Sequence, residues 1–334
     1  MSKSLNYKDI HLVPNYSNLT SRKDANTKVK LGNKEFQLPV VPANMASCIS
    51  FEKAEWLAQN NYFYILHRFY EYEEIIDWIY QSARFKGMTL PYVSVSLGIK
   101  KRDIDFIHKI KELKQYGIKL DYVTIDVAHG DHESALEMLR FLNIYKANEN
   151  PDMFIIGGNI ATGDAYIRMA GLVDAVKVGI ACGASCITYN KTGFASPMFS
   201  TIQEVKKAKK HLIEDRGVRA PIIIGDGGIS SNGDIAKAIT AGADMVMCGS
   251  MFARCIDSPA LVDPTDPTKK LYFGSASALN GNKKNIEGKT ISMPMNGMTY
   301  EQKLEEIQQD LSSAISYAGG KDLSAFNNVE WKLI

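Results

Sequence analysis

Two thiols stand close together in the run VGIACGASCITYNKTGFASP, which covers residues 178–197. Cys182 and Cys186 are four residues apart, and Thr188 follows the second cysteine by two residues. A thiol attacks an electrophilic carbon as its thiolate, and backbone amides at a helix N-terminus can lower its pKa enough to populate that form. Most cysteines serve instead as small buried apolar residues. The residues alone therefore leave open which of the two thiols is reactive, or whether either is.

A metal site is the other chemistry that paired cysteines suggest. A four-residue spacing suits two ligands, but the neighbouring sequence offers no further Cys or His to complete a site, so we do not favour it. Five cysteines in 334 residues are too few and odd in number for a disulfide framework. We interpret Cys48, Cys248 and Cys255 as core residues.

Eight short apolar runs are predicted to be strands buried on both faces, because they are almost continuously apolar. These runs are residues 39–45, 62–68, 92–98, 121–128, 153–160, 175–181, 221–228 and 245–252. Helix-sized segments separate them, at residues 51–60, 71–85, 101–117, 131–148, 163–173, 200–217 and 232–243. Eight strand–crossover units predict an α/β fold of the (β/α)8 TIM-barrel type. A doubly wound open sheet is the alternative, because periodicity does not show whether a sheet closes.

Two segments fall outside these units. Residues 1–35 precede the first predicted strand, and residues 256–298 follow the last one and are rich in Pro, Gly, Asn and Lys. A stretch of that length without periodicity is usually a functional flap or disordered. Residues 299–320 then read as a closing amphipathic helix. We predict a single catalytic domain over residues 1–334, with a flap at about 256–298.

Composition narrows the class of protein. Hydrophobic residues make up 45% of the chain and charged residues 23%, which is typical of a soluble globular protein. A net charge of +2 gives no indication of a nucleic-acid partner. The N-terminus lacks a signal-peptide pattern, and no apolar run reaches the roughly 20 residues that a membrane crossing needs. We expect a cytoplasmic protein without a nucleic-acid or membrane partner.

Barrel enzymes carry their sites at the C-terminal ends of the strands. The polar residues predicted there are Asn44, His67, Ser96, Asp126, His129, Asn159, Cys186 and Asp226. Each alone reads as a helix cap, but together they indicate a site. The runs GDGG at 225–228 and CGSMF at 248–252 follow the last two strands, where barrels often bind phosphate. Glycine lets backbone amides approach an anion, although the same runs also fit ordinary turns.

The run KVGIACGASCITYNKTGF resembles the active-site loop of the IMP dehydrogenase and GMP reductase family, whose pattern is K-V-G-x-G-x-G-S-x-C-x-T-R. Further segments follow in the family's order along nearly the whole chain: PVVPANM, IDVAHG, GGNIATG, IIIGDGGISSNGDIAKAITAGADMVMCGSMF, YFGSAS and EGKTISMPMNG. Residues 69–91, between the second and third predicted strands, are too few for the regulatory module that the dehydrogenases usually insert. Residues 287–290, EGKT, are similar to the reductase form. The resemblance therefore implies the reductase branch.

That resemblance implies an NADPH-dependent reductive deamination of GMP to IMP and ammonia. Cys186 falls on the nucleophile that forms a thioimidate at purine C2, and Thr188 and Glu287 fall on the pair that handles the proton of the leaving ammonia. The implied substrate-binding residues are Asp226, Gly227, Gly228, Gly249, Ser250, Gly183, Ser275 and Lys284. The implied cofactor-binding residues are Arg68, Ser96, Asp126 and Asn159. Backbone carbonyls of Gly183 and Cys186 fall on a potassium loop, and family members resemble one another in forming homotetramers.

Several positions depart from the family pattern. Ala184 lacks a hydroxyl that would contact the phosphate, a loss of about 1–2 kcal/mol. Tyr189 and Lys284 stand where arginine is expected, and Ser275 and Ala276 replace a Met-Ser pair. Arg68 replaces a family lysine, which keeps the charge but changes its shape.

These changes predict retained chemistry with an altered preference among purine nucleotides. The alternatives are an IMP dehydrogenase without its regulatory module and a catalytically silent nucleotide-binding paralogue. An unrelated barrel that binds a flavin phosphate is a third.

Overall fold

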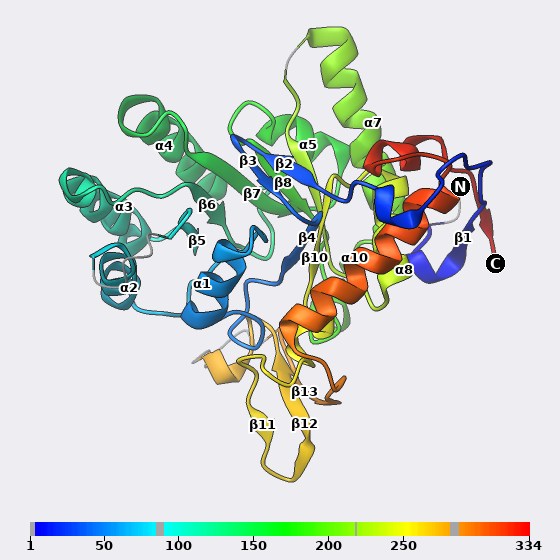
Figure 1. Ribbon diagram of the computed structural model, residues 1–334. Helices are drawn as coiled ribbons and strands as arrows, with labels where there is room; N and C mark the ends of the chain where they lie inside the picture. Colours follow the sequence, from blue (N-terminus) through cyan, green and yellow to red (C-terminus); the bar gives the residue numbers. More distant parts are fainter. Residues whose placement is uncertain (1–3, 85–89, 218, 281–286) are drawn as a thin grey trace.

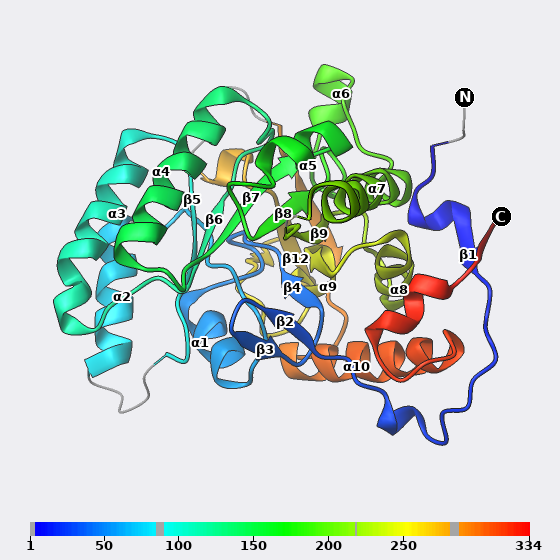
Figure 2. The same cartoon turned by 90° about the horizontal axis from the view of Figure 1, so that it is seen from above.

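The computed structural model describes residues 4–84, 90–217, 219–280 and 287–334. Its centre is a parallel sheet, which has seven strands in the described residues, in the order β4-β10-β9-β8-β7-β6-β5. The strands are β4 (Val40–Pro42), β5 (Ser94–Leu97), β6 (Tyr122–Ile125), β7 (Phe154–Ile160), β8 (Ala175–Val178), β9 (Ile222–Asp226) and β10 (Met245–Cys248). Helices alternate with them along the chain and surround the curled sheet (Figure 2). The predicted α/β fold of the (β/α)8 TIM-barrel type is confirmed.

The second predicted strand, residues 62–68, is reduced to a single bridge. Leu66 pairs in parallel with Val95 of β5, and the rest of the run is not a regular strand. Two buried tyrosines explain the difference, because their hydroxyls hydrogen-bond backbone N–H groups that would otherwise pair with the neighbouring strand. Tyr64 N–H donates to the Tyr92 hydroxyl at 3.2 Å, and Ser94 N–H donates to the Tyr64 hydroxyl at 3.3 Å. The position in the barrel is kept while the regular pairing is lost.

Six of the predicted strands end earlier than their apolar runs, and the last three of them border the loops described below. The run 221–228 stops as a strand at Asp226, because Gly227 and Gly228 take φ values of +109° and +76°, which are not extended. The run 175–181 stops at Val178. The run 245–252 stops at Cys248, and the short helix α9 (Ser250–Ala253) follows. Each early end opens a loop at the same edge of the sheet.

The outer layer contains the predicted helices. They are α1 (Phe51–Gln59), α2 (Tyr72–Arg84), α3 (Lys101–Leu113), α4 (Glu133–Glu149), α5 (Gly163–Met169), α7 (Met198–Arg216), α8 (Asn232–Ala241) and α10 (Tyr300–Tyr317). The closing helix α10 begins where its sequence predicts, since Thr299 and Gln302 form a capping box. A five-residue helix, α6 (Thr188–Thr192), lies in the loop after β8. Short 3₁₀ helices cover Tyr7–Asp9, Arg22–Asp24, Lys114–Tyr116, Ala278–Asn280 and Leu323–Asn328. None of the described helices combines the length and hydropathy that a membrane crossing requires.

The segment of residues 29–36 closes the end of the barrel at which the strands begin. Strands β2 (Val29–Leu31) and β3 (Lys34–Phe36) form a hairpin there. The Phe36 ring packs against Phe63, Tyr92 and Tyr122, with ring centres 5.1–6.1 Å apart. Tyr122 begins β6, and Phe63 and Tyr92 precede the Leu66 bridge and β5, so the hairpin seals the floor opposite the loops. Strand β1 (Ile10–Leu12) pairs antiparallel with β14 (Trp331–Leu333), which joins the two ends of the chain (Figure 1).

Residues 256–298 contain a second sheet. Strands β11 (Val262–Asp263), β12 (Asp266–Phe273) and β13 (Thr290–Pro294) pair antiparallel in that order, and Figure 1 shows them projecting from the barrel in yellow and orange. The described part of this segment is thus ordered, which favours the flap interpretation over disorder. Lys284 lies outside the described residues.

Three aspartates tie neighbouring strands together at their starts. Asp174, directly before β8, donates its backbone N–H to the carbonyl of Ile155 in β7 and accepts the N–H of Ile155 on its carboxylate, both at 2.8 Å. The same two bonds join Asp121 to Val93 and Asp244 to Ile223. A one-residue slip would break both bonds, so each aspartate fixes the register of a strand pair.

Candidate active site

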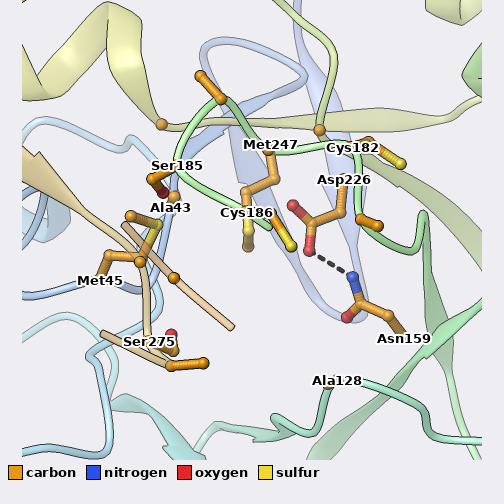
Figure 3. Close-up of a pocket in the computed structure, with 18 of the residues that line it drawn as sticks. Ala43, Met45, Ala128, Asn159, Cys182, Ser185, Cys186, Asp226, Met247 and Ser275 are labelled. Carbon is orange, nitrogen blue, oxygen red and sulfur yellow. Dashed lines mark hydrogen bonds between the residues drawn. The ribbon is translucent and has the colours of Figure 1, made fainter. Parts of the chain in front are cut away.

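A cavity of about 420 Å³ lies at the C-terminal ends of the strands, between their loops and the flap segment (Figure 3). Fourteen of the predicted site residues line it: Asn44, Arg68, Asp126, Asn159, Gly183, Cys186, Thr188, Asp226, Gly227, Gly228, Gly249, Ser250, Ser275 and Glu287. They come from loops far apart in the sequence. The structure therefore brings most of the predicted site together in one place.

Cys186, Thr188 and Glu287 form a continuous chain of hydrogen bonds. The Cys186 thiol donates to the Thr188 hydroxyl at 3.2 Å, and that hydroxyl donates to Glu287 Oε2 at 2.5 Å. Thr188 is the first residue of α6, which places its side chain two residues beyond the thiol. A proton can pass along such a chain between a nucleophile and a carboxylate.

Backbone hydrogen bonds hold Glu287 at the catalytic loop. Ile187 N–H donates to the carbonyl of Glu287 and Lys289 N–H donates to the carbonyl of Ser185, each at 2.8 Å. Between them, Cys186 and Gly288 pair as an isolated antiparallel bridge. Gly288 also packs against the turn at residues 276–277, where an added Cβ would stand 3.1 Å from Ser277 N. We call these backbone pairs at residues 185–187 and 287–289 the clamp.

The remaining described cysteines differ from Cys186 in their surroundings. Burial is the main cause that raises the pKa of Cys182 and of Cys48 to about 12 and of Cys255 to about 11, and burial also raises the pKa of Cys248. At neutral pH these thiols are overwhelmingly protonated. Cys182 lines the cavity, but its Sγ donates to the carbonyl of Ile180 at 3.1 Å. Among the thiols, Cys186 is the one that faces the cavity and contacts a hydroxyl–carboxylate pair.

The ends of β6, β8 and β9 carry a network of charges that includes an unpredicted residue. Lys177 is almost completely buried in β8, and its ammonium donates to Asp126 Oδ1 at 3.1 Å and Asp226 Oδ2 at 3.3 Å. Asn159 Nδ2 donates to the same Asp226 oxygen at 2.8 Å, the contact drawn in Figure 3. Arg68 Nε lies 3.5 Å from the other oxygen of Asp126. A lysine inside the apolar run DAVKVGIA is the sequence signal that could have revealed Lys177.

In this network, the ion pairs shift the pKa values of Lys177 and Asp126 more than burial does. Burial disfavours the charged ammonium of Lys177, but the carboxylates of Asp126 and Asp226 raise its pKa above the usual value. Burial likewise opposes ionisation of Asp126, yet the nearby cations Lys177 and Arg68 hold its pKa below the ordinary range. The wall therefore presents ionised groups at neutral pH.

Bare backbone lines the cavity after β9 and β10. An added Cβ on Gly227 would stand 2.7 Å from the Cys182 Cβ, and one on Gly249 would run into the Tyr272 hydroxyl. Glycine is therefore required at both positions, and the exposed peptide groups suit an anion such as phosphate. Ala184 and Ala276 also line this cavity and offer no side-chain hydrogen bond.

Ser96 is not part of the cavity wall. It is completely buried, and its hydroxyl donates to the carbonyl of Leu66 at 2.6 Å, so it supports the strand bridge instead of facing a ligand. His67 is also buried behind the wall; burial lowers its pKa to about 4, and its Nδ1 accepts the N–H of Phe69. Tyr189 and His129 are exposed and do not line the cavity.

The described residues contain no cluster of three or more His, Cys, Asp and Glu side chains that could hold a metal ion. A potassium loop would use backbone carbonyls instead. The carbonyl of Gly183 accepts the N–H of Cys186 at 3.0 Å, which forms a turn within this loop. A carbonyl oxygen has two lone pairs, so the second one is left for a ligand.

Comparison with known proteins agrees with these features. The family model of the IMP dehydrogenase / GMP reductase domain matches residues 4–333. The chain is 42% identical over 338 residues to a GMP reductase of Staphylococcus carnosus (strain TM300), which covers 99% of this chain and 97% of the relative. It is 43% identical over 334 residues to a GMP reductase of Streptococcus agalactiae serotype V, covering 98% and 94% of the two chains. With this similarity along nearly its whole length, the chain belongs to the IMP dehydrogenase and GMP reductase family.

Proposed function

We propose that the protein is a GMP reductase-like oxidoreductase that converts GMP to IMP and ammonia with NADPH as reductant. The hydrogen-bonded chain from Cys186 through Thr188 to Glu287, at the edge of a cavity with phosphate- and ribose-binding character, is the observation that carries the proposal. The curated relatives named GMP reductase add independent support.

The Cys186 thiol passes its proton through Thr188 to Glu287, and the resulting thiolate adds to C2 of the guanine ring. The C2–N2 bond then breaks, and the amino group leaves as ammonia with a proton delivered through Thr188 from Glu287. C2 remains bonded to the sulfur as a thioimidate, so one difficult displacement becomes two easier steps. Bound NADPH would supply the hydride that reduces C2. Breaking of the C–S bond then returns the Cys186 thiolate and releases IMP.

The cavity offers separate places for the parts of the nucleotide. The peptide groups at Gly227, Gly228, Gly249 and Ser250 suit the phosphate, and the Asp226 carboxylate is an acceptor suited to ribose hydroxyls. Gly183 and Ser275 lie beside them. Next to Asp226, the cavity also presents the charged groups of Arg68 and Asp126 and the amide of Asn159, which fit a nicotinamide carboxamide. Ser96 does not join them.

The specificity is altered on the phosphate and base side. Ala184 and Ala276 line the cavity without the hydroxyls of the family pattern, and each missing hydrogen bond costs about 1–2 kcal/mol of binding. Asp226 still favours a ribose. We therefore expect weak use of GMP, or preference for a related purine nucleotide with a modified base.

Further expectations complete the proposal. Residues 1–334 form a single catalytic domain, and the 256–298 segment acts as the flap. Residues 67–93, between the Leu66 bridge and β5, are too few for a regulatory domain. The protein binds potassium through carbonyls of Gly183 and Cys186, assembles as a homotetramer and acts in the cytoplasm. Comparing activity in potassium buffer with activity in sodium buffer tests potassium binding. Light scattering of the purified protein tests the homotetramer.

Absorbance at the NADPH band tests the reaction. We expect consumption of NADPH with a purine monophosphate, and none with Cys186→Ala. Production of NADH from IMP and NAD⁺ would instead identify a dehydrogenase without its regulatory module. Binding of nucleotides without turnover or a trapped Cys186 adduct would identify a silent paralogue.

A further inference from the structure

Lys177 is a buried cation that none of the proposed chemical steps uses. Its side chain is 2% exposed, and it lies in the cavity wall on β8 between carboxylates from β6 and β9. A buried ammonium is expensive unless it is paired and hydrogen-bonded. Here it pairs with two groups, Asp126 and Asp226, that the proposed function assigns to different ligand parts.

The two oxygens of Asp226 are used differently. Oδ2 accepts from Lys177 Nζ at 3.3 Å and from Asn159 Nδ2 at 2.8 Å. Among the residues that the structure describes, no donor reaches Oδ1. Since the carboxylate lines the cavity and Oδ2 is held from behind, Oδ1 is the oxygen left for a ligand.

Asn159 alone is a weak anchor for this arrangement. Its amide is neutral and also donates to the carbonyl of Gly179 at 2.8 Å. Without Lys177, the half-buried Asp226 would keep one neutral hydrogen bond and lose the cation that holds Oδ2 in place. The carboxylate could then rotate about its side-chain bonds, and Oδ1 would no longer face the cavity in one fixed orientation.

We propose that Lys177 is a positioning residue that makes the site selective for ribose. It holds Asp226 by one oxygen so that the other faces the vicinal hydroxyls of a purine ribonucleotide. The inference rests on the proposed function for the class of ligand, and it adds the residue that determines ribose recognition. Besides Lys177, this network contains the charged side chains of Arg68, Asp126 and Asp226 and the amide of Asn159.

Binding of GMP and of 2′-deoxy-GMP, measured by calorimetry, tests the proposal. A hydroxyl bonded to a charged acceptor contributes roughly tenfold to a hundredfold in affinity, so the wild type should prefer GMP by about that factor. Lys177→Met should remove most of this preference, and Lys177→Arg should retain part of it. A general effect on folding or packing would weaken both nucleotides equally and leave their ratio unchanged.

A double-mutant cycle shows whether Lys177 acts through Asp226. Lys177→Met and Asp226→Asn should each remove most of the preference, and the double variant should lose no more than Asp226→Asn alone. Lys146→Met is the matched control, because Lys146 pairs with Asp174 at 2.7 Å away from the cavity. If Lys177→Met does not fold, the charge-balanced Lys177→Met/Asp126→Asn variant, which keeps Asp226, replaces it.

The outcomes separate the two proposals. A folded Lys177→Met protein with the wild-type preference for GMP, or additive effects in the cycle, overturns the role of Lys177 and leaves the proposed function standing. A wild type that binds purine nucleotides without discriminating the 2′-hydroxyl also overturns it. A wild type that binds neither nucleotide overturns both.

Discussion

The Thr188 hydroxyl donates a 2.5 Å hydrogen bond to the carboxylate of Glu287, which lies 99 residues further along the chain. One partner belongs to the loop after β8 and the other to the segment that carries β13. The proposed proton path therefore exists only when this segment is folded onto the barrel.

Replacing either partner of that hydrogen bond should slow turnover without preventing folding. Loss of a positioned proton-transfer group costs about 10²- to 10⁴-fold in rate. We expect Thr188→Ala and Glu287→Gln to lower kcat by this order with little change in KM. Thr192→Ala is the control, because Thr192 lies on the same short helix and its hydroxyl donates to the Thr188 carbonyl and accepts the Phe194 N–H, both backbone groups. Full activity in Glu287→Gln would remove Glu287 from the proposed path.

Alkylation should distinguish the two thiols of the catalytic loop. At pH 8 a thiol with a pKa of about 12 is ionised in roughly one molecule in 10⁴, so Cys182 should react slowly with iodoacetamide. We expect peptide mass spectrometry to find the early label on Cys186. Labelling of Cys182 should accelerate as the pH is raised toward its pKa. Equal early labelling of both thiols at pH 8 would contradict this assignment.

Ala184→Ser should strengthen nucleotide binding. A serine hydroxyl at this cavity position could donate to the phosphate, which is worth about 1–2 kcal/mol or roughly a tenfold lower Kd. Guanosine provides the control, because it lacks the phosphate and its affinity should not change. Tighter binding of guanosine and GMP alike would place the new hydroxyl elsewhere.

Gly288→Ala should disturb the clamp and, through it, Glu287. The added Cβ would stand 3.1 Å from Ser277 N and 3.2 Å from Ala276 C, which are backbone atoms that cannot move aside alone. We expect kcat to fall more than tenfold while the urea midpoint changes little. Gly171→Ala is the matched control, since no atom lies within 4 Å of a Cβ there. Equal kinetics in the two variants would show that the clamp tolerates displacement.

The buried charge network should make the free energy of unfolding decrease at acidic pH. The pKa of Asp126 is lowered in the folded protein, so its contribution is present above the unfolded value of about 3.9 and is lost as the pH falls through the folded pKa. Urea unfolding between pH 7 and pH 3 should show a smaller acid loss in Asp126→Asn than in the wild type. The same slope in both proteins would contradict ionisation of Asp126 in the folded state.

Removing the cation of that network should lower the free energy of unfolding more than removing a surface charge does. Lys177→Met leaves Asp126 and Asp226 together in a low-dielectric wall, which typically destabilises by about 3–5 kcal/mol. Urea unfolding at pH 7 measures the change. Lys28→Met, which breaks the exposed pair with Glu35, should lie within about 1 kcal/mol of the wild type.

The sequence predicted the barrel well because its strands and helices follow distinct periodicities. It failed where side chains replace backbone pairing, as the hydroxyls of Tyr64 and Tyr92 do in the second strand. The small sheet of the 256–298 segment was missed because its strands β12 and β13 are half-exposed and separated by long connections. The pattern of apolar and polar residues does not indicate that β12 and β13, which are far apart in the sequence, pair with each other.

The structure gathers most of the predicted site residues around one cavity, including Asn159 of β7 and Asp226 of β9, but it places Ser96 of β5 outside the cavity. The loop residue Cys186 could be identified from its motif, whereas Ser96 stands at a strand end with its hydroxyl turned to Leu66, which sequence does not reveal. Lys177 was overlooked because a strand position in an apolar run is normally core. Its two partners approach only once β6, β8 and β9 are neighbours.

The aspartates Asp121, Asp174 and Asp244 fix the strand register at the floor of the barrel, whereas the cavity lies at the opposite end. Substitutions in the upper loops, such as those at Ala184 and Ala276, therefore leave these anchors untouched. A lineage can change what the cavity accepts without re-evolving how the strands align. The capacity of this fold to change its ligand resides in that separation between a base that fixes strand register and a rim of loops that does not.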